Sequence, residues 1–239
     1  MALIVALMAM LFMSAIGTAL VLTTSVDSKI TRNFRISTEA LYAADAVLER
    51  AVDDLRGIHD WSLVLSGAAQ SAFVDGSPAG TRTLADGRRI DLGELVNLAD
   101  CRKAAACSDA EMDDVSADRP WAANNPRWQL FAWGRLDAIA AEGSVSSPFY
   151  VVVMAADDPS ENDGDPLRDG RALCAQGQAT ECNPGTGTLA LRAEAFGPFG
   201  AHKILELTIS RTDLTGSEED YNDGSGQVGV RILSWREVR

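Results

Sequence analysis

The first 26 residues, Met1 to Val26, contain no charged side chain, and this feature constrains the fold more than any other. A helix needs about 20 apolar residues to span a bilayer, and residues 1–22 supply them without a proline. The stretch is too long for the apolar region of a cleaved signal peptide, and it has neither a basic flank before it nor a small-residue cleavage site after it. We therefore expect it to lie in a bilayer or in an apolar bundle of helices.

An amphipathic pattern continues beyond this segment. Apolar or small residues recur every three or four positions, which is the helical period, and charged residues occupy the opposite face. The recurring residues are Val26, Ile30, Phe34, Ser37, Leu41, Ala44, Leu48, Val52 and Leu55. The sequence thus predicts one helix over residues 1–56, about 84 Å long at 1.5 Å per residue, followed by an exported head over residues 57–239. On pattern alone, a signal anchor with a juxtamembrane helix is the alternative.

The net charge of −13 is concentrated in the head, because residues 1–56 contribute −1 and residues 57–239 contribute −12. An acidic head disfavours nucleic acid and anionic lipid as partners. Lys29, Arg32 and Arg35 follow the apolar segment, and by the positive-inside rule alone they would place the head in the cytoplasm. The paired cysteines favour the opposite orientation, and we predict that the head is exported.

The four cysteines form two close couples, Cys101 with Cys107 and Cys174 with Cys182. Four cysteines allow three connectivities, and we favour pairing within each couple. In an exported head, each of these disulfide bonds would close a short loop. Zinc is a weaker interpretation, because the ligands are few and badly spaced.

Alternating and apolar runs predict four antiparallel strands, at residues 149–155, 188–196, 203–211 and 228–238, with a hairpin connection at residues 197–200. Because an antiparallel sheet must bury one face, the amphipathic half of the long helix is expected to cover it. The predicted fold class is α+β, with the long helix packed on a four-stranded sheet that carries inserted loops.

The segment between the helix and these strands is harder to interpret. We expect a short helix or irregular segment at 60–73, a loop at 76–87, a short strand at 88–92 and a polar surface excursion at 100–118. Trp121, Trp128 and Trp133 are predicted to pack a loop onto the sheet and helix, and an exposed recognition patch is the alternative.

The sequence does not contain a known catalytic motif. It has neither HExxH nor GxSxG, and only two histidines, so we predict that the protein is not an enzyme. Residues 224–229 match GxGxxG, but a strand follows where dinucleotide binding needs a helix.

Acidic residues between the predicted strands form a candidate calcium site, because dense carboxylate oxygens can wrap Ca²⁺. These residues are Asp157, Asp158, Glu161, Asp163, Asp165 and Asp169. Pro166 and Ala172 stand where an EF-hand needs Gly and Glu, so the loop is not an EF-hand. A second acidic cluster lies at 218–223, and solvated loops are the alternative for both.

The runs MALIVALMAMLFMSAIGTALVLTTS and FRISTEALYAADAVLERAVDDL resemble the N-terminal segment of PilX-type minor pilins of type IV pili. In that family a prepilin peptidase cleaves after a glycine, and the mature chain begins with the hydrophobic helix. The resemblance therefore implies that Met1 is the processed and N-methylated terminus, and that a basic leader once preceded it. It covers about the first 56 residues, and the head matches more loosely.

One departure from the pilin pattern bears on function. Most major pilins carry Glu at the fifth mature position, where it neutralises a neighbour's N-terminal amine, and this chain has Val5. The resemblance thus implies an initiating or tip-proximal minor pilin. It would be held in the bacterial inner membrane with a periplasmic head and later enter the extracellular pilus.

The resemblance also implies partners. These are other minor and major pilins, contacted through the N-terminal helix, and a tip adhesin. The alternatives are a tip pseudopilin of a type II secretion system, and a membrane-anchored periplasmic binding or enzyme domain.

Overall fold

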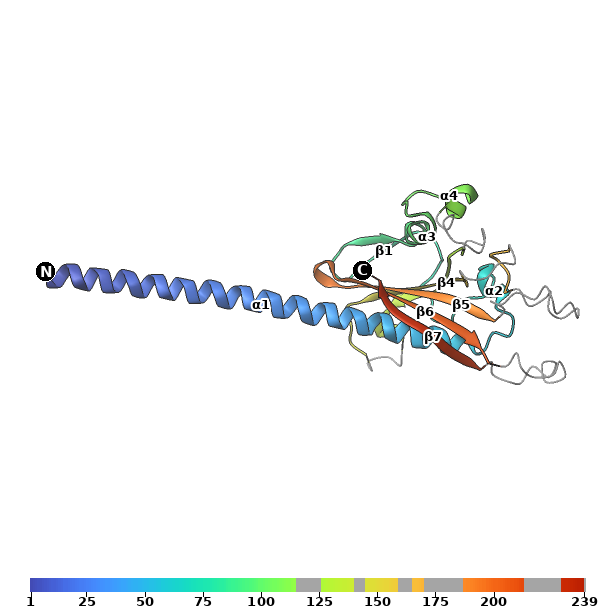
Figure 1. Cartoon of the computed structure of the whole chain (residues 1–239), viewed down its shortest axis with the longest axis horizontal. Coiled ribbons are helices and arrows are strands. Elements are labelled where there is room, and N and C mark those ends of the chain that lie inside the picture. Colours follow the sequence, from blue (N-terminus) through green and yellow to red (C-terminus); the bar gives the residue numbers. More distant parts are fainter. Residues whose placement is uncertain (115–125, 140–144, 159–164, 170–186, 213–228, 239) are drawn as a thin grey trace, which may run out of the picture. The chain divides into compact units, whose positions relative to one another are not determined.

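The computed structural model describes residues 1–114, 126–139, 145–158, 165–169, 187–212 and 229–238. The chain divides into two compact units, Met1–Glu39 and Ala40–Arg239. A single helix, α1 (Ala2–Leu55), begins in the first unit and ends in the second (Figure 1). The amphipathic part of α1 from Ala40 onward therefore belongs to the head unit.

In the first unit α1 is long and apolar enough to cross a membrane, by its length and composition. Its hydroxyl side chains have partners within the helix. Thr18 donates to the carbonyl of Ser14 at 3.0 Å, and Thr24 donates to that of Leu20 at 2.9 Å. Hydroxyls bonded to the preceding turn present little polar surface, which suits a helix in an apolar environment.

The head unit is built on an antiparallel sheet with the strand order β3-β4-β5-β6-β7 (Figure 1). The strands are β3 (Gln129–Arg135), β4 (Tyr150–Asp157), β5 (Thr188–Phe196), β6 (His202–Arg211) and β7 (Val230–Val238). A short 3₁₀ turn, η2 (Pro198–Gly200), joins β5 to β6, which confirms the predicted hairpin. The predicted strands agree with β4 to β7 within one or two residues at most ends.

The predicted strand count was wrong, because the main sheet has five strands. The additional strand, β3, occupies one end of the sheet and was interpreted as a tryptophan-rich loop. Five consecutive residues of β3, from Leu130 to Gly134, are buried. A strand buried on both faces lacks the alternation that predicts β6, and β3 has no run of β-branched residues like the one in β4.

Two further predictions in this region need correction. The stretch at 76–87 is not all loop, because β1 (Thr81–Thr83) lies within it and pairs with β2 (Arg89–Asp91). The strand predicted at 88–92 ends at Asp91, whose carboxylate caps the unpredicted helix α3 (Leu92–Cys101) by accepting from two backbone N–H groups. Three short helices complete the described elements: α2 (Ser62–Leu65), α4 (Asp109–Asp114) and η1 (Leu136–Ala138).

The two ends of the sheet differ in how they are covered. The segment 71–75 runs beside β3, where Trp133 donates to the carbonyl of Phe73 at 3.1 Å and accepts from Asp75 at 2.8 Å. At the other end, β7 is exposed over most of its length. Its pairing with β6 shifts register between Thr208 and Ile209. Irregular edges discourage pairing with other chains.

The core consists of two layers on opposite faces of the sheet. The strand register puts Leu191, Leu207 and Ile209 on one face of the sheet, and the head portion of α1 covers this face (Figure 1). The α1 residues buried there are mostly small, and Ala40, Ala44 and Ala51 have no exposed surface. The other face carries a second cluster, formed by residues of α3, β3 and β4 around Leu92, Leu95, Trp133, Val152 and Met154.

The burial of one face of α1 in the head gives a first prediction. Ala44→Leu adds bulk where Ala44 is fully buried, so it should lower the free energy of unfolding by about 1–3 kcal/mol. Ala46→Leu, at a partly exposed position on the same helix, is the matched control and should change stability by less than about 0.5 kcal/mol. Urea unfolding of the full chain in detergent micelles, followed by near-ultraviolet circular dichroism, measures both. Equal stabilities for the two variants would contradict this packing.

Candidate assembly surface and the polar network of the head

The apolar portion of α1 presents its large side chains to the surroundings. Every large hydrophobic residue from Met1 to Phe34 is at least 53% exposed, and Leu3, Phe12 and Leu22 are close to 70% exposed. A continuous apolar surface of this size marks a site of contact with protein or lipid. Helices in an apolar medium associate through packing complementarity, so the same surface suits lipid and neighbouring helices equally.

The N-terminal amine of Met1 has no acidic residue near it in the sequence, because the first carboxylate is that of Asp27. Val5 occupies the first turn, where its backbone N–H donates to the carbonyl of Met1 at 3.3 Å. A charged amine placed in an apolar bundle is costly unless a carboxylate pairs with it. The Val5 side chain cannot supply that carboxylate to a neighbouring helix.

Carboxylates of α1 attach the helix to the head. Asp45 accepts from the indole Nε1 of Trp235 in β7 at 3.2 Å. Asp54 accepts from the hydroxyl of Ser71 and from the backbone N–H of Ala72, and it pairs with Arg50 at 3.1 Å. These bonds connect the helix to both ends of the sheet, since Trp235 lies in β7 and the segment after Ser71 runs beside β3.

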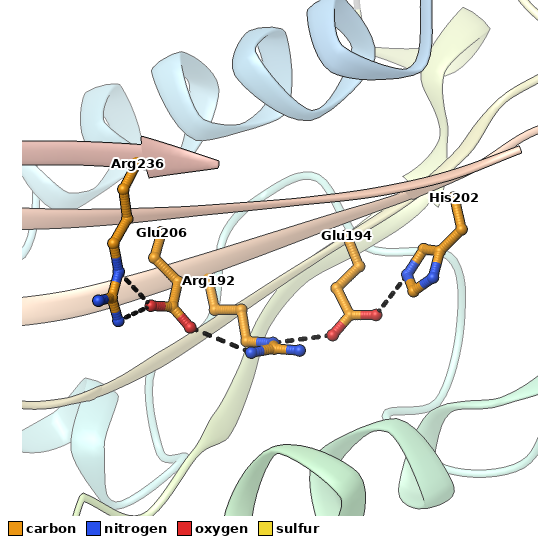
Figure 2. A network of polar contacts seen from close by, with 5 residues as sticks. All are labelled: Arg192, Glu194, His202, Glu206 and Arg236. Atoms are coloured by element: carbon orange, nitrogen blue, oxygen red, sulfur yellow. Dashed lines mark hydrogen bonds and ion pairs between the residues drawn. The ribbon is translucent and has the colours of Figure 1, made fainter. Parts of the chain in front are cut away.

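A chain of five charged and polar side chains crosses β5, β6 and β7 on the face of the sheet away from α1 (Figure 2). Arg192 lies opposite Glu206, and Glu206 lies opposite Arg236. The guanidinium of Arg192 donates to Glu206 at 3.0 Å and to Glu194 at 2.8 Å, and Arg236 donates to Glu206 at 2.8 Å. His202 lies 2.8 Å from the other oxygen of Glu194.

Glu194 is the buried centre of this network, with 4% of its surface exposed. Burial acts to raise the pKa of Glu194, but the hydrogen bond with His202 and the charge of Arg192 outweigh it and lower the pKa. The His202 ring also stacks on Phe196, with 4.4 Å between ring centroids. Both oxygens of Glu194 are therefore occupied, which favours a structural role in joining three strands.

Removing the buried carboxylate gives a second prediction. Glu194→Gln leaves Arg192 and His202 with a weaker partner, so the free energy of unfolding should fall by about 1–3 kcal/mol. The pKa of Glu194 is lowered in the folded state. The ionised carboxylate therefore stabilises the wild-type chain fully above the unfolded-state pKa near 4.5. This stabilisation is lost as pH falls through the lower, folded-state pKa. The variant should show a flatter stability profile below pH 5.

Arg236→Gln is the matched control, because the Arg236 side chain is 72% exposed at the outer end of the same network. An exposed ion pair contributes less than about 1 kcal/mol. Urea unfolding between pH 3 and pH 7 compares the two variants. The interpretation fails if both variants lose the same stability at pH 7.

A disulfide joins Cys101 to Cys107, with 6.0 Å between their Cα atoms. It closes the loop after α3, where Arg102 adopts a left-handed backbone conformation at the helix end. This is the local pairing expected for that couple. Cys174 and Cys182 lie outside the described residues, so their pairing stays a prediction.

Asp100 is a buried carboxyl beside this disulfide, where the sequence pattern predicted an exposed one. It is 8% exposed, and its Oδ1 accepts from the backbone N–H of Trp128 at 2.7 Å. Burial raises the pKa of Asp100 to about 6, against the opposing effects of the Trp128 hydrogen bond and the charge of Arg127. The expected polar excursion at 100–118 was therefore wrong for Asp100 and Cys101, both of which are buried.

Asp100→Asn is the third prediction. Because the pKa is raised on folding, Asp100 contributes most to folding stability below its unfolded-state pKa of 3.8, where the carboxyl is neutral. This contribution is lost as pH rises through the folded-state pKa of about 6. The amide oxygen can still accept from Trp128 but carries no charge, so the variant should be more stable than wild type at pH 7.5 by about 1–3 kcal/mol. Thermal unfolding at pH 4 and pH 7.5 measures this. A variant less stable than wild type at pH 7.5 would show that the buried charge of Asp100 does not destabilise the folded state.

The candidate calcium residues are only partly described. Asp157 is buried at the end of β4, Asp165 pairs with Arg168 at 3.2 Å, and Asp169 is buried and accepts from the backbone N–H of Gly187 at 2.6 Å. Asp158 follows Asp157 and donates its backbone N–H to that carboxylate. Glu161 and Asp163 lie outside the described residues, as does the second cluster at 218–223.

In the described part of the chain, no three His, Cys, Asp or Glu residues gather closely enough to hold a metal ion. A buried cation lies at the same end of the sheet instead. The strand register places Arg211 of β6 on the same face as Asp157, two residues beyond Ile209. The Arg211 guanidinium donates to the carbonyl of His59 and lies 5.4 Å above the Trp61 ring. Calcium binding stays a prediction.

Comparison with known proteins adds evidence for the N-terminal segment. The family model described as PilX N-terminal matches residues 1–49. The comparison with curated proteins and the comparison with solved structures each found no match. The matched segment holds the exposed apolar surface and most of α1, and the α+β architecture with its five-stranded sheet is pilin-like. The chain thus carries a PilX-type N-terminal segment and is similar to the minor pilins of type IV pili.

Proposed function

We propose that this chain is a structural minor pilin of a type IV pilus that primes assembly or occupies a tip-proximal position. The observation that supports it most directly is the exposed apolar surface of α1 between Met1 and Phe34. That surface lies on the same helix whose second half is buried in the head unit. A membrane anchor alone needs about 20 apolar residues, whereas α1 continues as one helix from that segment into the core of a folded domain.

The mechanism is one of assembly energetics. Before assembly, the apolar part of α1 lies in the inner membrane with the head in the periplasm. On entry into the filament the same surface exchanges lipid contacts for contacts with the helices of other minor and major pilins. Since both environments are apolar, the exchange is driven by packing complementarity between helices. The head then lies at the filament surface, where it can present a tip adhesin.

Val5 supports a position at the end of the filament. A subunit that offers no carboxylate at this position leaves the N-terminal amine of the adjacent subunit uncompensated in an apolar core. This cost is tolerable at one contact near a tip, and it grows with each repeat in a filament body. The absence of a carboxylate at Val5 therefore agrees with the resemblance to minor pilins.

The decisive experiment follows the chain in the source cell. Pili are sheared from wild-type cells and from a deletion strain, and the sheared fraction is analysed by mass spectrometry with an inner-membrane protein as the contamination control. We expect the chain in the fibre fraction, with a processed, methylated terminus at Met1, and fewer pili in the deletion strain. Absence from the fibres together with unchanged piliation would reject the proposal. An intact basic leader on the mature protein would favour an anchored periplasmic domain instead.

A substitution at Val5 gives the fourth prediction. Val5→Glu supplies the missing carboxylate, so the chain should enter sheared pili in at least a severalfold higher ratio to the major pilin. Val5→Gln has the same size without the charge and is the control. The ratio is measured by quantitative mass spectrometry. If the two variants enter pili equally, the charge at this position does not limit incorporation.

A further inference from the structure

The turn between β5 and β6 holds a large apolar side chain in an unfavourable backbone conformation. Phe199 has a φ of 58°, in the left-handed region that glycine adopts freely and bulky residues avoid. Its side chain is also 67% exposed, as is that of Tyr42, and the other large hydrophobic residues of the described head are less exposed. Neither backbone preference nor burial accounts for a phenylalanine at this position. Strain of this kind is a reason to look for a function.

The turn that carries Phe199 is held from both sides. The backbone N–H of Gly197 donates to the carbonyl of Ala201 at 2.9 Å, and the guanidinium of Arg88, in the β1–β2 connection, donates to the carbonyl of Gly197. Gly197 also lies so close to Phe149 that an added Cβ would be 2.1 Å from the ring. The turn thus has a fixed shape, and a contact made through the exposed surface of Phe199 breaks none of these bonds.

The turn lies at the end of the head at which α1 enters. Arg211, the last residue of β6, donates to the carbonyl of His59, which lies just beyond the C-terminal end of α1. Trp235, which pairs with the middle of β6, donates to Asp45 in the head portion of α1. β6 therefore runs in the same direction as α1 within the head and begins at its Ala40 end (Figure 1).

The hairpin extends past that end of the head. Leu207 pairs with Trp235, and His202 lies five strand residues before Leu207, a distance of about 17 Å. Ala40 lies five helical residues before Asp45, a distance of only about 7.5 Å. Since β6 and α1 run alongside each other here, the start of β6 projects about 10 Å beyond Ala40, and the turn with Phe199 lies further out still.

The hairpin differs in charge from the rest of the acidic head. Residues 195–205 contain no carboxylate, and apart from His202 and Lys203 they are apolar or glycine. In the neighbouring β1–β2 connection, Asp86 is paired with Arg88 at 2.8 Å, so its charge is compensated. An aromatic residue on a tip of this composition suits the boundary between headgroups and acyl chains of a bilayer.

We propose that Phe199 inserts into the surface of the bilayer that holds α1, so that the β5–β6 turn rests on the membrane before assembly. The contact depends on burial of an apolar ring and not on attraction to anionic lipid, which agrees with the negative charge of the head. A head held by α1 and by this turn meets other subunits in one orientation. The contact rests on the part of the proposed function that places α1 in the membrane.

The length of the chain allows this contact. Residues 27–39 separate Ala40 from the uncharged segment, and they provide at most about 20 Å of helix. The projection of the hairpin and the size of the Phe199 ring take up much of this length. Spanning helices are also tilted by about 20° on average, which lowers one side of an attached domain toward the bilayer.

A photo-crosslinking residue at position 199 gives the fifth prediction. The full chain is placed in nanodiscs of phosphatidylcholine, a lipid without net charge, with benzoylphenylalanine in place of Phe199 or of Leu63. Leu63 is the matched control, because it is 46% exposed in α2, beside Trp61 and Arg211 at the opposite end of β6. We expect lipid adducts, counted by mass spectrometry, to be at least fivefold more frequent at position 199 than at position 63.

Phe199→Gly separates a membrane contact from a role in the fold. Glycine suits the left-handed conformation, so the variant should unfold within about 4 °C of wild type in detergent micelles. In nanodiscs with spin-labelled headgroups, the nuclear magnetic resonance signal of the Ala201 methyl group should be broadened at least threefold more in wild type than in the variant. A purely structural role for the ring predicts the reverse: lower stability and unchanged broadening.

Three results would each overturn the contact. They are equal lipid adducts at positions 199 and 63, a larger fall in unfolding temperature in Phe199→Gly, and adducts at position 199 in cells that join protein in place of lipid. If lipid adducts are absent while the chain is found in sheared pili, the contact is rejected and the pilin assignment stands. If lipid adducts form while the chain is absent from pili, the contact stands on an anchored domain.

Discussion

The burial of one small-residue face of α1 against the sheet is the interaction on which the rest of the head depends. Ala40, Ala44 and Ala51 are fully buried on this face, and Leu48 and Leu55 are buried with them. Without the helix, this face of the sheet would expose a large apolar surface, which folded domains rarely leave uncovered. The helix that carries the exposed apolar surface is therefore also part of the core of the head.

Polar bonds add to the apolar contacts that hold the helix in the head. The bonds of Asp45 and Asp54 fix the helix to opposite ends of the sheet. On the other face, the network around Glu194 joins β5, β6 and β7 through paired charges (Figure 2). Removing one partner of a buried ion pair is costly, because it leaves the other charge unpaired.

The correct predictions from the sequence share a physical origin. The uncharged span and the helical spacing up to Leu55 are local patterns, and so is the alternation in β5 and β6. Each can be recognised within a short window of residues, because the pattern lies in the order of neighbouring side chains. β3 and α3 were missed for the opposite reason. β3 is buried on both faces, and α3 is short and begins at a residue that was assigned to a strand.

The sequence alone therefore determined the long helix, the α+β class and the resemblance to minor pilins, since all three depend on residue order along single elements. Tertiary structure decided which residues meet across the chain. It buried Asp100 beneath Trp128, joined Arg192 to Glu194 and Glu206, and placed Arg211 over Trp61 at the end where calcium ligands were expected. These contacts join residues from separate elements, and their energies depend on burial, which no local pattern encodes.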